Sequence, residues 1–364
     1  MFKKVNYLHK NDTIGLRKDM ITIAKLFGHK KYKFCVWLTY KNFPGKRNTK
    51  HPCSTRDITN ALNIHIEKTP IYLPRNSTNY LMVNHELLDE YIEKHIKQNR
   101  IDKIICKTPI AEQIIKHINR NANTELIEFE PESKYMNITP DKNIYVQLCG
   151  AGGFKNQLAT ITAWYNNKKL LNDKKKKLII TYSYSDDSKE EFHPRTEFRD
   201  YIKRKNARPS TLSLGPYELE CDRIKNIYII DKFIPDNAYA YLQAIAYTHV
   251  CVSIVEGFGH YIWEPAINGR RVITTDAEPM ISVARKACAK YVTDKTISIR
   301  NPLRGLTASE KKQINKLIIS IPVREEKTIY DTFGKQSWYP KNIPMGKCYF
   351  VDEEKLSSIF KCCK

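Results

Sequence analysis

Short apolar runs alternate along the chain with longer segments in which apolar residues recur at helical spacing. Residues 16–27, LRKDMITIAKLF, place five apolar side chains on one helical face, and residues 109–118 and 237–247 follow a similar pattern. Runs and helical segments that alternate in this way are typical of an α/β protein with parallel sheets. We expect two series of strands, at 4–8, 34–38, 80–84 and 103–106, then at 144–149, 177–182, 227–230, 250–255 and 271–275.

A polar segment, residues 128–142, separates the two series. It contains two prolines and is followed at once by a new strand and helix. A chain of 364 residues is also long for a single core. We therefore expect two Rossmann-like domains, 1–140 and 141–340, that face each other across a cleft at the carboxyl ends of their strands. The tail, 341–364, has a helical pattern and could pack back on the first domain.

The net charge points to anionic partners. The chain contains 61 Lys and Arg against 39 Asp and Glu, which gives +22. Residues 1–50 hold 13 basic and only 2 acidic residues, and residues 174–177 are four consecutive lysines. Such an excess favours a nucleotide, a nucleic acid or an anionic lipid surface as partner. Taken alone, the lysine run is typical of a solvated loop before a strand.

Other classes of protein are disfavoured. No stretch approaches the roughly 18 apolar residues that span a bilayer, and MFKKVNYLHK lacks the apolar core of a signal peptide. The ten cysteines form no CxxC pair, and no Asp-x-Asp motif follows a predicted strand, so we expect no metal site. We expect free thiols and a cytoplasmic protein, with peripheral association with anionic surfaces left open.

Residues 250–280 give the clearest chemical signal. Glu256 follows a strand expected to end at Val255, and Glu264 lies about two helical turns further on. Glycines between them allow the backbone to approach a ligand, and the first amides of a helix favour a phosphate. The two carboxylates could accept hydrogen bonds from sugar hydroxyls. The residues expected to form the ligand-facing turn are Gly257, Phe258, Gly259 and His260.

This segment resembles the donor-binding signature of retaining glycosyltransferases with the GT-B fold, especially glycosyltransferase family four. The family's hallmark is two glutamates separated by seven residues, which Glu256-GFGHYIW-Glu264 matches. In that family the first glutamate contacts hydroxyls of the donor sugar and the second binds the ribose. The resemblance implies metal-independent transfer of a sugar from a nucleoside diphosphate sugar. It makes Glu256 a catalytic candidate and Glu264 a donor-binding one.

A second stretch, residues 146–164, resembles the part of the family that clamps the diphosphate. It contains a strand, a glycine loop and a basic residue, which makes Lys155 the catalytic cation and Gly153 a donor-binding residue. An arginine usually precedes this lysine, but residues 151–153, Ala-Gly-Gly, stand in its place. Either the site is weaker or another cation substitutes. The candidates for that cation are Arg17, Lys18 and Arg195.

The first domain resembles the family more loosely. Residues 11–19 occupy the place of its glycine loop, which makes Gly15 a candidate for close approach to the donor, with a simple turn glycine as the alternative. Residues 80–88 resemble the strand end that faces the active site. His85, a catalytic candidate, could orient a sugar hydroxyl or the acceptor, or could be structural. The candidates in this segment are Asn84, His85 and Glu86.

The leading hypothesis is therefore a retaining glycosyltransferase with a UDP- or GDP-sugar as donor and no other cofactor. The acceptor would be a glycan, a lipid, a protein or another anionic molecule. The charge suggests as alternatives a nucleic-acid-binding protein or a glycosyltransferase that modifies DNA, although no nucleic-acid-binding motif is recognisable. An inert GT-B module, an epimerase and a phosphorylase are further interpretations of the same fold, and the glutamate pair argues against the inert module.

Overall fold

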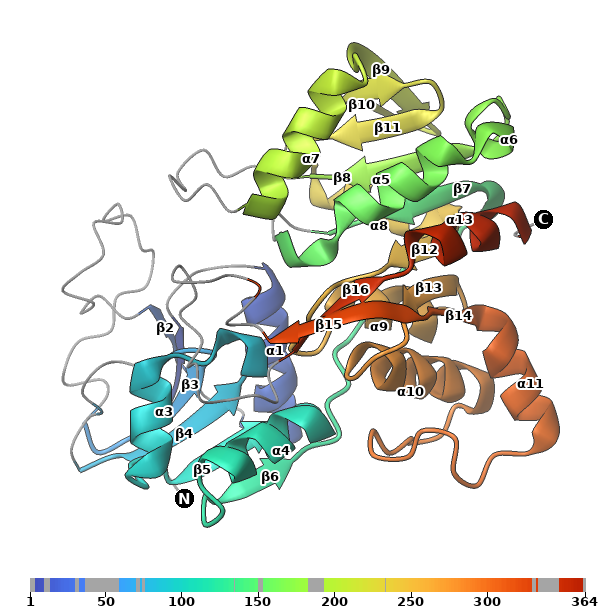
Figure 1. Cartoon of the computed structure of the whole chain (residues 1–364). Coiled ribbons are helices and arrows are strands. Elements are labelled where there is room, and N and C mark those ends of the chain that lie inside the picture. The colour runs from blue at the N-terminus through green and yellow to red at the C-terminus, as the bar shows by residue number, and fades with distance from the viewer. Residues whose placement is uncertain are drawn as a thin grey trace. The chain divides into compact units, whose positions relative to one another are not determined.

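The chain forms two compact units (Figure 1). Unit 1 comprises Met1–Glu132 and Lys327–Cys348, and unit 2 comprises Ser133–Glu326 and Tyr349–Lys364. The change of unit after Glu132 falls within the polar segment 128–142. The computed structural model describes residues 4–9, 14–29, 33–36, 59–69, 73, 76–133, 135–149, 153–182, 193–232, 234–328, 332 and 347–362.

Unit 1 contains a six-stranded sheet in the order β2-β1-β3-β4-β5-β6, in which every described pairing is parallel. Its strands bury apolar side chains on both faces, as parallel sheets covered by helices do. The strands are β1 (Val5–His9), β2 (Lys33–Val36), β3 (Leu62–Ile66), β4 (Thr78–Val83), β5 (Lys103–Cys106) and β6 (Thr124–Leu126). The helical elements are α1 (Ile14–Leu26), the 3-10 turn η1 (His85–Leu87), α3 (Glu90–Lys97) and α4 (Pro109–Ile118).

Strand β3 was not expected from the sequence because Asn63 and His65 interrupt its apolar pattern. Both side chains are fully buried. Asn6, Asn63 and Asn79 lie opposite one another on β1, β3 and β4. Asn6 donates to Asn63 at 3.0 Å, Asn63 donates to Asn79 at 3.4 Å, and His65 contacts Asn79 at 3.2 Å. This row of amides supplies the hydrogen bonds that buried polar groups require.

Unit 2 contains an eight-stranded sheet in the order β14-β13-β12-β7-β8-β11-β10-β9. The first six strands in this order, from β14 to β11, pair in parallel. The last two, β10 and β9, form an antiparallel hairpin, and β10 is also antiparallel to β11. The hairpin was not expected because it alternates buried with exposed residues and so lacks an apolar run. The strands are β7 (Asp141–Gln147), β8 (Lys177–Thr181), β9 (Arg208–Leu214), β10 (Tyr217–Ile224), β11 (Ile227–Ile230), β12 (Ala246–Cys251), β13 (Arg271–Thr275) and β14 (Ile318–Ile321).

Helices cover this sheet, and a smaller two-stranded sheet precedes the last of them (Figure 1). The helices are α5 (Gln157–Asn166), α6 (Lys168–Leu171), α7 (His193–Arg204), α8 (Asp236–Ile245), α9 (His260–Ile267), α10 (Met280–Thr293), α11 (Ala308–Leu317) and α13 (Glu353–Cys362). The small sheet pairs β15 (Val323–Thr328) with β16 (Lys347–Val351). Within the described residues, no helix combines the length and the apolar composition needed to cross a bilayer.

The tail helix α13 packs on α5 of unit 2, whereas the sequence suggested that the tail could pack on the first domain. Its Phe360 ring is fully buried and lies edge-on to Trp164, with the ring centroids 5.2 Å apart. Tyr145 of β7 completes this aromatic cluster, 6.1 Å from Phe360. Leu356, one helical turn earlier, is also fully buried. The apolar face of α13 is therefore part of the core of unit 2.

Strand β12 ends at Cys251, four residues before the expected Val255. The apolar residues that follow remain buried, but the backbone of Ile254 bonds to β16 and to the 3-10 turn η2 instead of to a neighbouring strand of the eight-stranded sheet. Ile254 receives a hydrogen bond from the amide of Tyr349 at 2.7 Å and donates its own amide to Phe154 at 2.8 Å. Burial alone thus explains the apolar run, and residues 252–259 form a buried loop.

Candidate functional site

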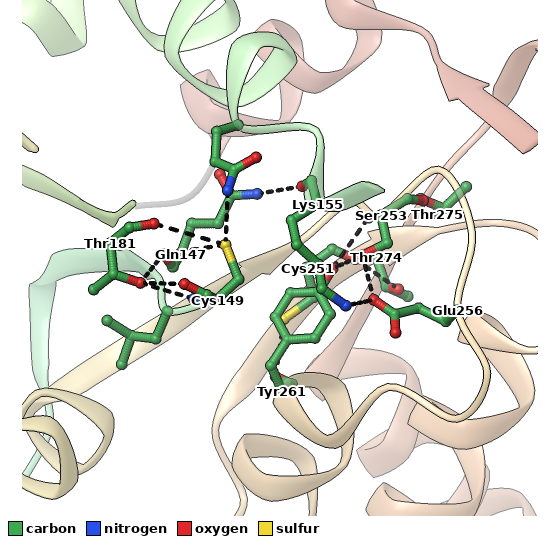
Figure 2. A network of polar contacts seen from close by, with 12 residues as sticks. Gln147, Cys149, Lys155, Thr181, Cys251, Ser253, Glu256, Tyr261, Thr274 and Thr275 are labelled. Carbon is green, nitrogen blue, oxygen red and sulfur yellow. Dashed lines mark hydrogen bonds and ion pairs between the residues drawn. The ribbon is translucent and has the colours of Figure 1, made fainter. Parts of the chain in front are cut away.

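Polar side chains gather where the central strands of unit 2 end (Figure 2). Four neighbouring parallel strands, β13, β12, β7 and β8, have as their last residues Thr275, Cys251, Gln147 and Thr181. Because the strands are parallel, the loops that follow them begin at the same edge of the sheet, where α/β proteins commonly bind ligands. The polar ends of these apolar strands were the signal in the sequence that our predictions did not use.

At this edge Lys155 forms an ion pair with Glu256, a residue 101 positions later in the chain. Lys155 ends the 3-10 turn η2 (Gly153–Lys155), and Glu256 lies in the loop between β12 and α9. The side chains retain 22% and 7% of their exposure, so a ligand in solution can reach the lysine. The structure therefore brings together the two residues of unit 2 that the sequence marked as catalytic candidates.

One hydroxyl group binds the Glu256 carboxylate, and a second lies next to the first. Ser253 donates its hydroxyl proton to Oε1 of Glu256 over 2.5 Å. The Ser253 hydroxyl also contacts the hydroxyl of Tyr261, which accepts a hydrogen bond from the Ser253 amide at 3.1 Å. The Lys155 ammonium lies 4.8 Å from the centroid of the Tyr261 ring, a cation–π distance. Burial raises the pKa of Tyr261 well above its usual value, so its hydroxyl keeps its proton.

The loop that carries Lys155 is fixed by the ends of β7 and β8. Gln147 donates its side-chain amide to the Lys155 carbonyl at 2.6 Å, and the Cys149 amide donates to the Thr181 hydroxyl at 2.8 Å. Gln157 of α5 donates to the Cys149 thiol at 3.3 Å. Burial raises the pKa of this thiol to about 12, so Cys149 is neutral at physiological pH and serves as a packing group.

The glycine turn before α9 has a conformation that requires glycine. Gly259 has φ +90°, and a Cβ there would lie 3.0 Å from Cδ1 of Ile262. Gly257 is buried, and the Phe258 ring is 2% exposed and packs 5.8 Å from Trp263, so that ring belongs to the core. His260 begins α9 and is partly exposed. The turn and the first amides of α9 thus lie directly after Glu256 in the chain.

Glu264 lies in the middle of α9 and is buried. Gln243 of α8 donates its side-chain amide to Oε2 of Glu264 at 2.6 Å. The Gln243 carbonyl accepts from the Tyr135 hydroxyl at 2.5 Å and contacts the His249 ring at 3.1 Å. Burial lowers the pKa of His249 to about 3, so its ring is neutral. These buried groups hold one oxygen of Glu264 in a fixed position.

The candidates in unit 1 lie at the corresponding edge of its own sheet. Asn84 follows β4 and donates to the Glu67 carboxylate, which lies just after β3. His85 is 3% exposed, and burial, reinforced by the nearby Lys107, lowers its pKa to about 4. Its imidazole is therefore neutral near pH 7. Burial raises the pKa of Glu67 to about 8; the nearby Lys107 opposes this rise, and Asp19 and Glu86 add to it.

The remaining candidates are placed less specifically. Gly15 lies in the first turn of α1, where an added Cβ would meet no atom within 4 Å. This position is open enough for a ligand to approach, and nothing in its surroundings demands glycine. Arg17 is exposed and Lys18 is half-buried on the same helix, while the side chain of Arg195 lies outside the described residues. No group of His, Cys, Asp and Glu side chains suited to a metal ion occurs among the described residues.

No family model and no curated protein matches the chain. Its structure is nevertheless similar to known structures over nearly the whole chain. Sucrose-phosphate synthase from Thermosynechococcus elongatus is 12% identical, and the match covers 87% of this chain and 95% of that one with a TM-score of 0.50. A trehalose-6-phosphate synthase, studied for glycosyl transfer with retention, is 8% identical, with 99% and 98% covered and a TM-score of 0.52.

The catalytic domain of starch synthase IV from Arabidopsis thaliana, solved with ADP and acarbose, is 7% identical, with 99% and 98% covered and a TM-score of 0.52. At these identities the likeness establishes the fold. The chain has two Rossmann-like units of the GT-B type, which confirms the predicted fold class. The roles of individual residues rest on the geometry of the site.

Proposed function

We propose that the protein is a retaining glycosyltransferase that moves a sugar from a nucleoside diphosphate sugar to an acceptor hydroxyl. The observation that carries the proposal is the meeting of Lys155 and Glu256 beside the glycine turn, at the carboxyl edge of a parallel sheet, in a chain with the GT-B fold. A cation, a carboxylate and a helix N-terminus are the groups needed to bind a diphosphate joined to a sugar.

Each residue has a separate role in this proposal. Lys155 and the first amides of α9 bind the diphosphate, while Glu256 accepts a hydrogen bond from a hydroxyl of the donor sugar. Glu264 accepts from the ribose hydroxyls through the carboxylate that Gln243 orients. The closeness of Lys155 to Glu256 supports these roles, because the diphosphate and the sugar are adjacent in the donor.

The chemical step needs little from protein side chains. In transfer with retention, the acceptor oxygen forms its bond to the anomeric carbon on the face from which the diphosphate departs. The bond from that carbon to the diphosphate oxygen breaks, and the departing oxygen takes the acceptor proton. The protein aligns the two substrates and stabilises negative charge on the diphosphate, chiefly through Lys155. Neutral His85 is suited to a hydrogen bond with a substrate hydroxyl, as the resemblance implies.

The donor is expected to be a UDP- or GDP-sugar. The acceptor class follows from charge, because an excess of +22 favours a glycan, lipid or protein that carries negative groups, or an anionic surface on which it lies. DNA fits the same charge and is the alternative acceptor. A comparison of neutral with phosphorylated glycans, anionic lipids and DNA oligonucleotides would identify the class.

A panel of nucleotide sugars tests the function directly. We expect one or more donors to be hydrolysed slowly, and their nucleoside diphosphate to raise the melting temperature equally with and without EDTA. At about 100 times its Kd such a ligand adds about 2.7 kcal/mol of stability. Proton NMR of the product from an α-linked donor should show an α-linked sugar. A β-linked product would exclude retention, and the absence of any thermal shift or turnover would exclude the proposed activity.

A further inference from the structure

The Glu256 carboxylate receives its hydrogen bonds on one oxygen only. Both Lys155 and the Ser253 hydroxyl bind Oε1, and no side chain or amide in the described part of the chain bonds to Oε2. Ser253 is fully buried and belongs to the protein's own framework, whereas Lys155 is partly exposed. A ligand can therefore compete for Lys155 without displacing Ser253.

The direction of every hydrogen bond around Ser253 follows from the donors available. A carboxylate only accepts, so the single hydroxyl proton of Ser253 must point at Glu256. The Ser253 amide donates to the Tyr261 oxygen. The contact between the two hydroxyls then has one solution, in which Tyr261 donates its proton to the oxygen of Ser253. The hydrogen bonds thus form a chain in which Tyr261 donates to Ser253 and Ser253 donates to Glu256.

Tyr261 also contacts the cation of the pair. Its ring lies beneath the Lys155 ammonium, and its hydroxyl begins the chain of hydrogen bonds that ends on Glu256. The ring and the hydroxyl of one side chain therefore act on the two members of the ion pair separately. Thr275 supports the arrangement from β13, because its hydroxyl donates to the Ser253 carbonyl at 2.7 Å.

We propose that Ser253 and Tyr261 are positioning residues. They hold Glu256 and Lys155 in place after the donor has broken the ion pair between these two residues. The donor diphosphate takes over Lys155, which remains above the Tyr261 ring. Ser253 then holds Oε1 of Glu256 alone, and Oε2 accepts a hydrogen bond from a hydroxyl of the donor sugar. This inference rests on the proposed function. It means that the Glu256 carboxylate, held in place by Ser253, selects a donor sugar that has a hydroxyl at the matching position.

Four variants separate the two parts of the proposal: Ser253→Ala, Ser253→Thr, Tyr261→Phe and Tyr261→Leu. Ser253→Ala removes a hydrogen bond to a charged group, so we expect kcat to fall about tenfold to a hundredfold. The Kd of the nucleoside diphosphate, which has no sugar, should stay within about twofold of wild type. Ser253→Thr, which keeps the hydroxyl, should recover most of kcat.

The tyrosine variants distinguish the hydroxyl from the ring. Tyr261→Phe keeps the ring under Lys155 and should lower kcat about threefold to tenfold with an unchanged nucleotide Kd. Tyr261→Leu also removes the ring and should weaken nucleotide binding a further threefold to tenfold. The matched control is Tyr165→Phe, because the Tyr165 ring also lies under a lysine. Its centroid is 4.1 Å from the Lys205 ammonium, at the C-terminal end of α5, whereas Lys155 precedes the N-terminal end of that helix. This control should change neither quantity.

A second readout uses donors that lack one sugar hydroxyl. The deoxy donor that loses the partner of Glu256 should be turned over about tenfold or more slowly by wild type, and this penalty should shrink in Ser253→Ala. A purely structural role for Ser253 would lower both rates equally. That result, or a kcat within twofold of wild type for both Ser253→Ala and Tyr261→Phe, would overturn the proposal.

The test also distinguishes the proposal from the function on which it rests. If wild type binds and turns over a nucleotide sugar but the variants match it, only the roles of Ser253 and Tyr261 are wrong. If wild type binds no nucleoside diphosphate, the proposed function itself fails. Should Ser253→Ala not fold in a melting experiment, Tyr261→Phe decides the matter, because it removes one oxygen and keeps the shape of the ring.

Discussion

Each unit joins a lysine to a carboxylate at the carboxyl edge of its sheet, and the two pairs differ in exposure. In unit 1 Lys107 follows β5 and binds Asp19 of α1 at 2.7 Å, with side chains 2% and 3% exposed. In unit 2 Lys155 binds Glu256, and the lysine is 22% exposed. The same two chemical groups thus form a sealed contact in one unit and an accessible one in the other.

The difference in exposure determines what each pair can do. A buried pair cannot exchange its partner, because removing either charge leaves the other without solvent or counter-charge. In a pair whose lysine is partly exposed, water or a ligand can take the place of the carboxylate as the partner of the lysine. Lys107–Asp19 is therefore suited to holding α1 against the sheet, and Lys155–Glu256 is suited to opening for a phosphate. Exposure, more than the identity of the residues, separates the sealed pair from the accessible one.

The largest effect is expected from Lys107→Met. This change removes the counter-charge of a buried carboxylate, Asp19, so we expect the free energy of unfolding to fall by about 3–5 kcal/mol, as measured by urea denaturation. Lys25→Met is the matched control, because Lys25 also lies on α1 and forms an ion pair, with Glu132, but on the surface. Its cost should stay below about 1 kcal/mol. Similar losses for both variants would contradict the distinction between sealed and exposed pairs.

The second prediction concerns the accessible pair and is read in rate. Lys155→Ala should lower kcat of sugar transfer about 10² to 10³-fold, because it removes a group that meets charge developing on the diphosphate. Lys155→Arg, which keeps the charge, should retain more activity, and His85→Ala should be less damaging than Lys155→Ala. The urea midpoint of Lys155→Ala should stay close to that of wild type. A large loss of stability with normal turnover would reverse the roles of the two pairs.

The third prediction concerns the burial of His85 at the carboxyl edge of the unit 1 sheet, and it is measured as the pH dependence of stability. The pKa of folded His85 is about 4 against 6.5 for a free histidine, so the unfolded chain binds the proton first. The contribution of His85 to the free energy of unfolding is complete above pH 6.5 and is lost as the pH falls towards 4. The loss is roughly 3 kcal/mol, because each unit of pKa difference corresponds to about 1.4 kcal/mol. His85→Gln should remove this part of the acid sensitivity in melting curves from pH 8 to 4.

The control for this experiment is His117→Gln on the exposed face of α4. His65 and His249 are also buried with lowered pKa values, so both variants keep a common acid-sensitive background. Only the difference between wild type and His85→Gln is informative. If that difference is independent of pH, the His85 environment is open to water and the edge of unit 1 is not sealed.

The smallest effect should come from pyrophosphate, which tests whether the Lys155 pair opens. At about ten times its Kd, pyrophosphate should add about 1.4 kcal/mol of stability to wild type. Lys155→Ala should lose this gain, whereas Lys25→Met should keep it. A thermal shift that survives in Lys155→Ala would place the anion elsewhere on this basic chain.

The elements that could be predicted from the sequence are those whose apolar residues recur at the spacing of a single helix or strand. Strand β5 and helix α4 begin and end at the predicted residues, because their apolar positions match one structural period. Strand β3 was missed, since Asn63 and His65 are buried polar residues whose partners lie on other strands. The β9–β10 hairpin was missed because one of its faces is exposed, so its residues form no apolar run.

The site was predictable in part for the same reason. The turn at Gly259 and the neighbouring Glu256 lie in one contiguous segment, so a family resemblance can mark them. The partners of Glu256 cannot be found this way, because the contact with Lys155 joins residues 101 apart. Ser253 and Tyr261 look like interruptions of an apolar run and of a helix until the structure places their hydroxyls together. Long-range contacts of this kind require the folded chain.

The amide row of Asn6, Asn63 and Asn79 bears on how unit 1 acquires its strand order. Apolar strands of similar length are nearly interchangeable partners, but an asparagine inside a sheet is satisfied only opposite another polar side chain. Sliding β1 by one residue would turn Asn6 to the opposite face of the sheet and break its hydrogen bond to Asn63. The three amides thus help to set the register of the first strand against a strand that lies 57 residues later in the chain.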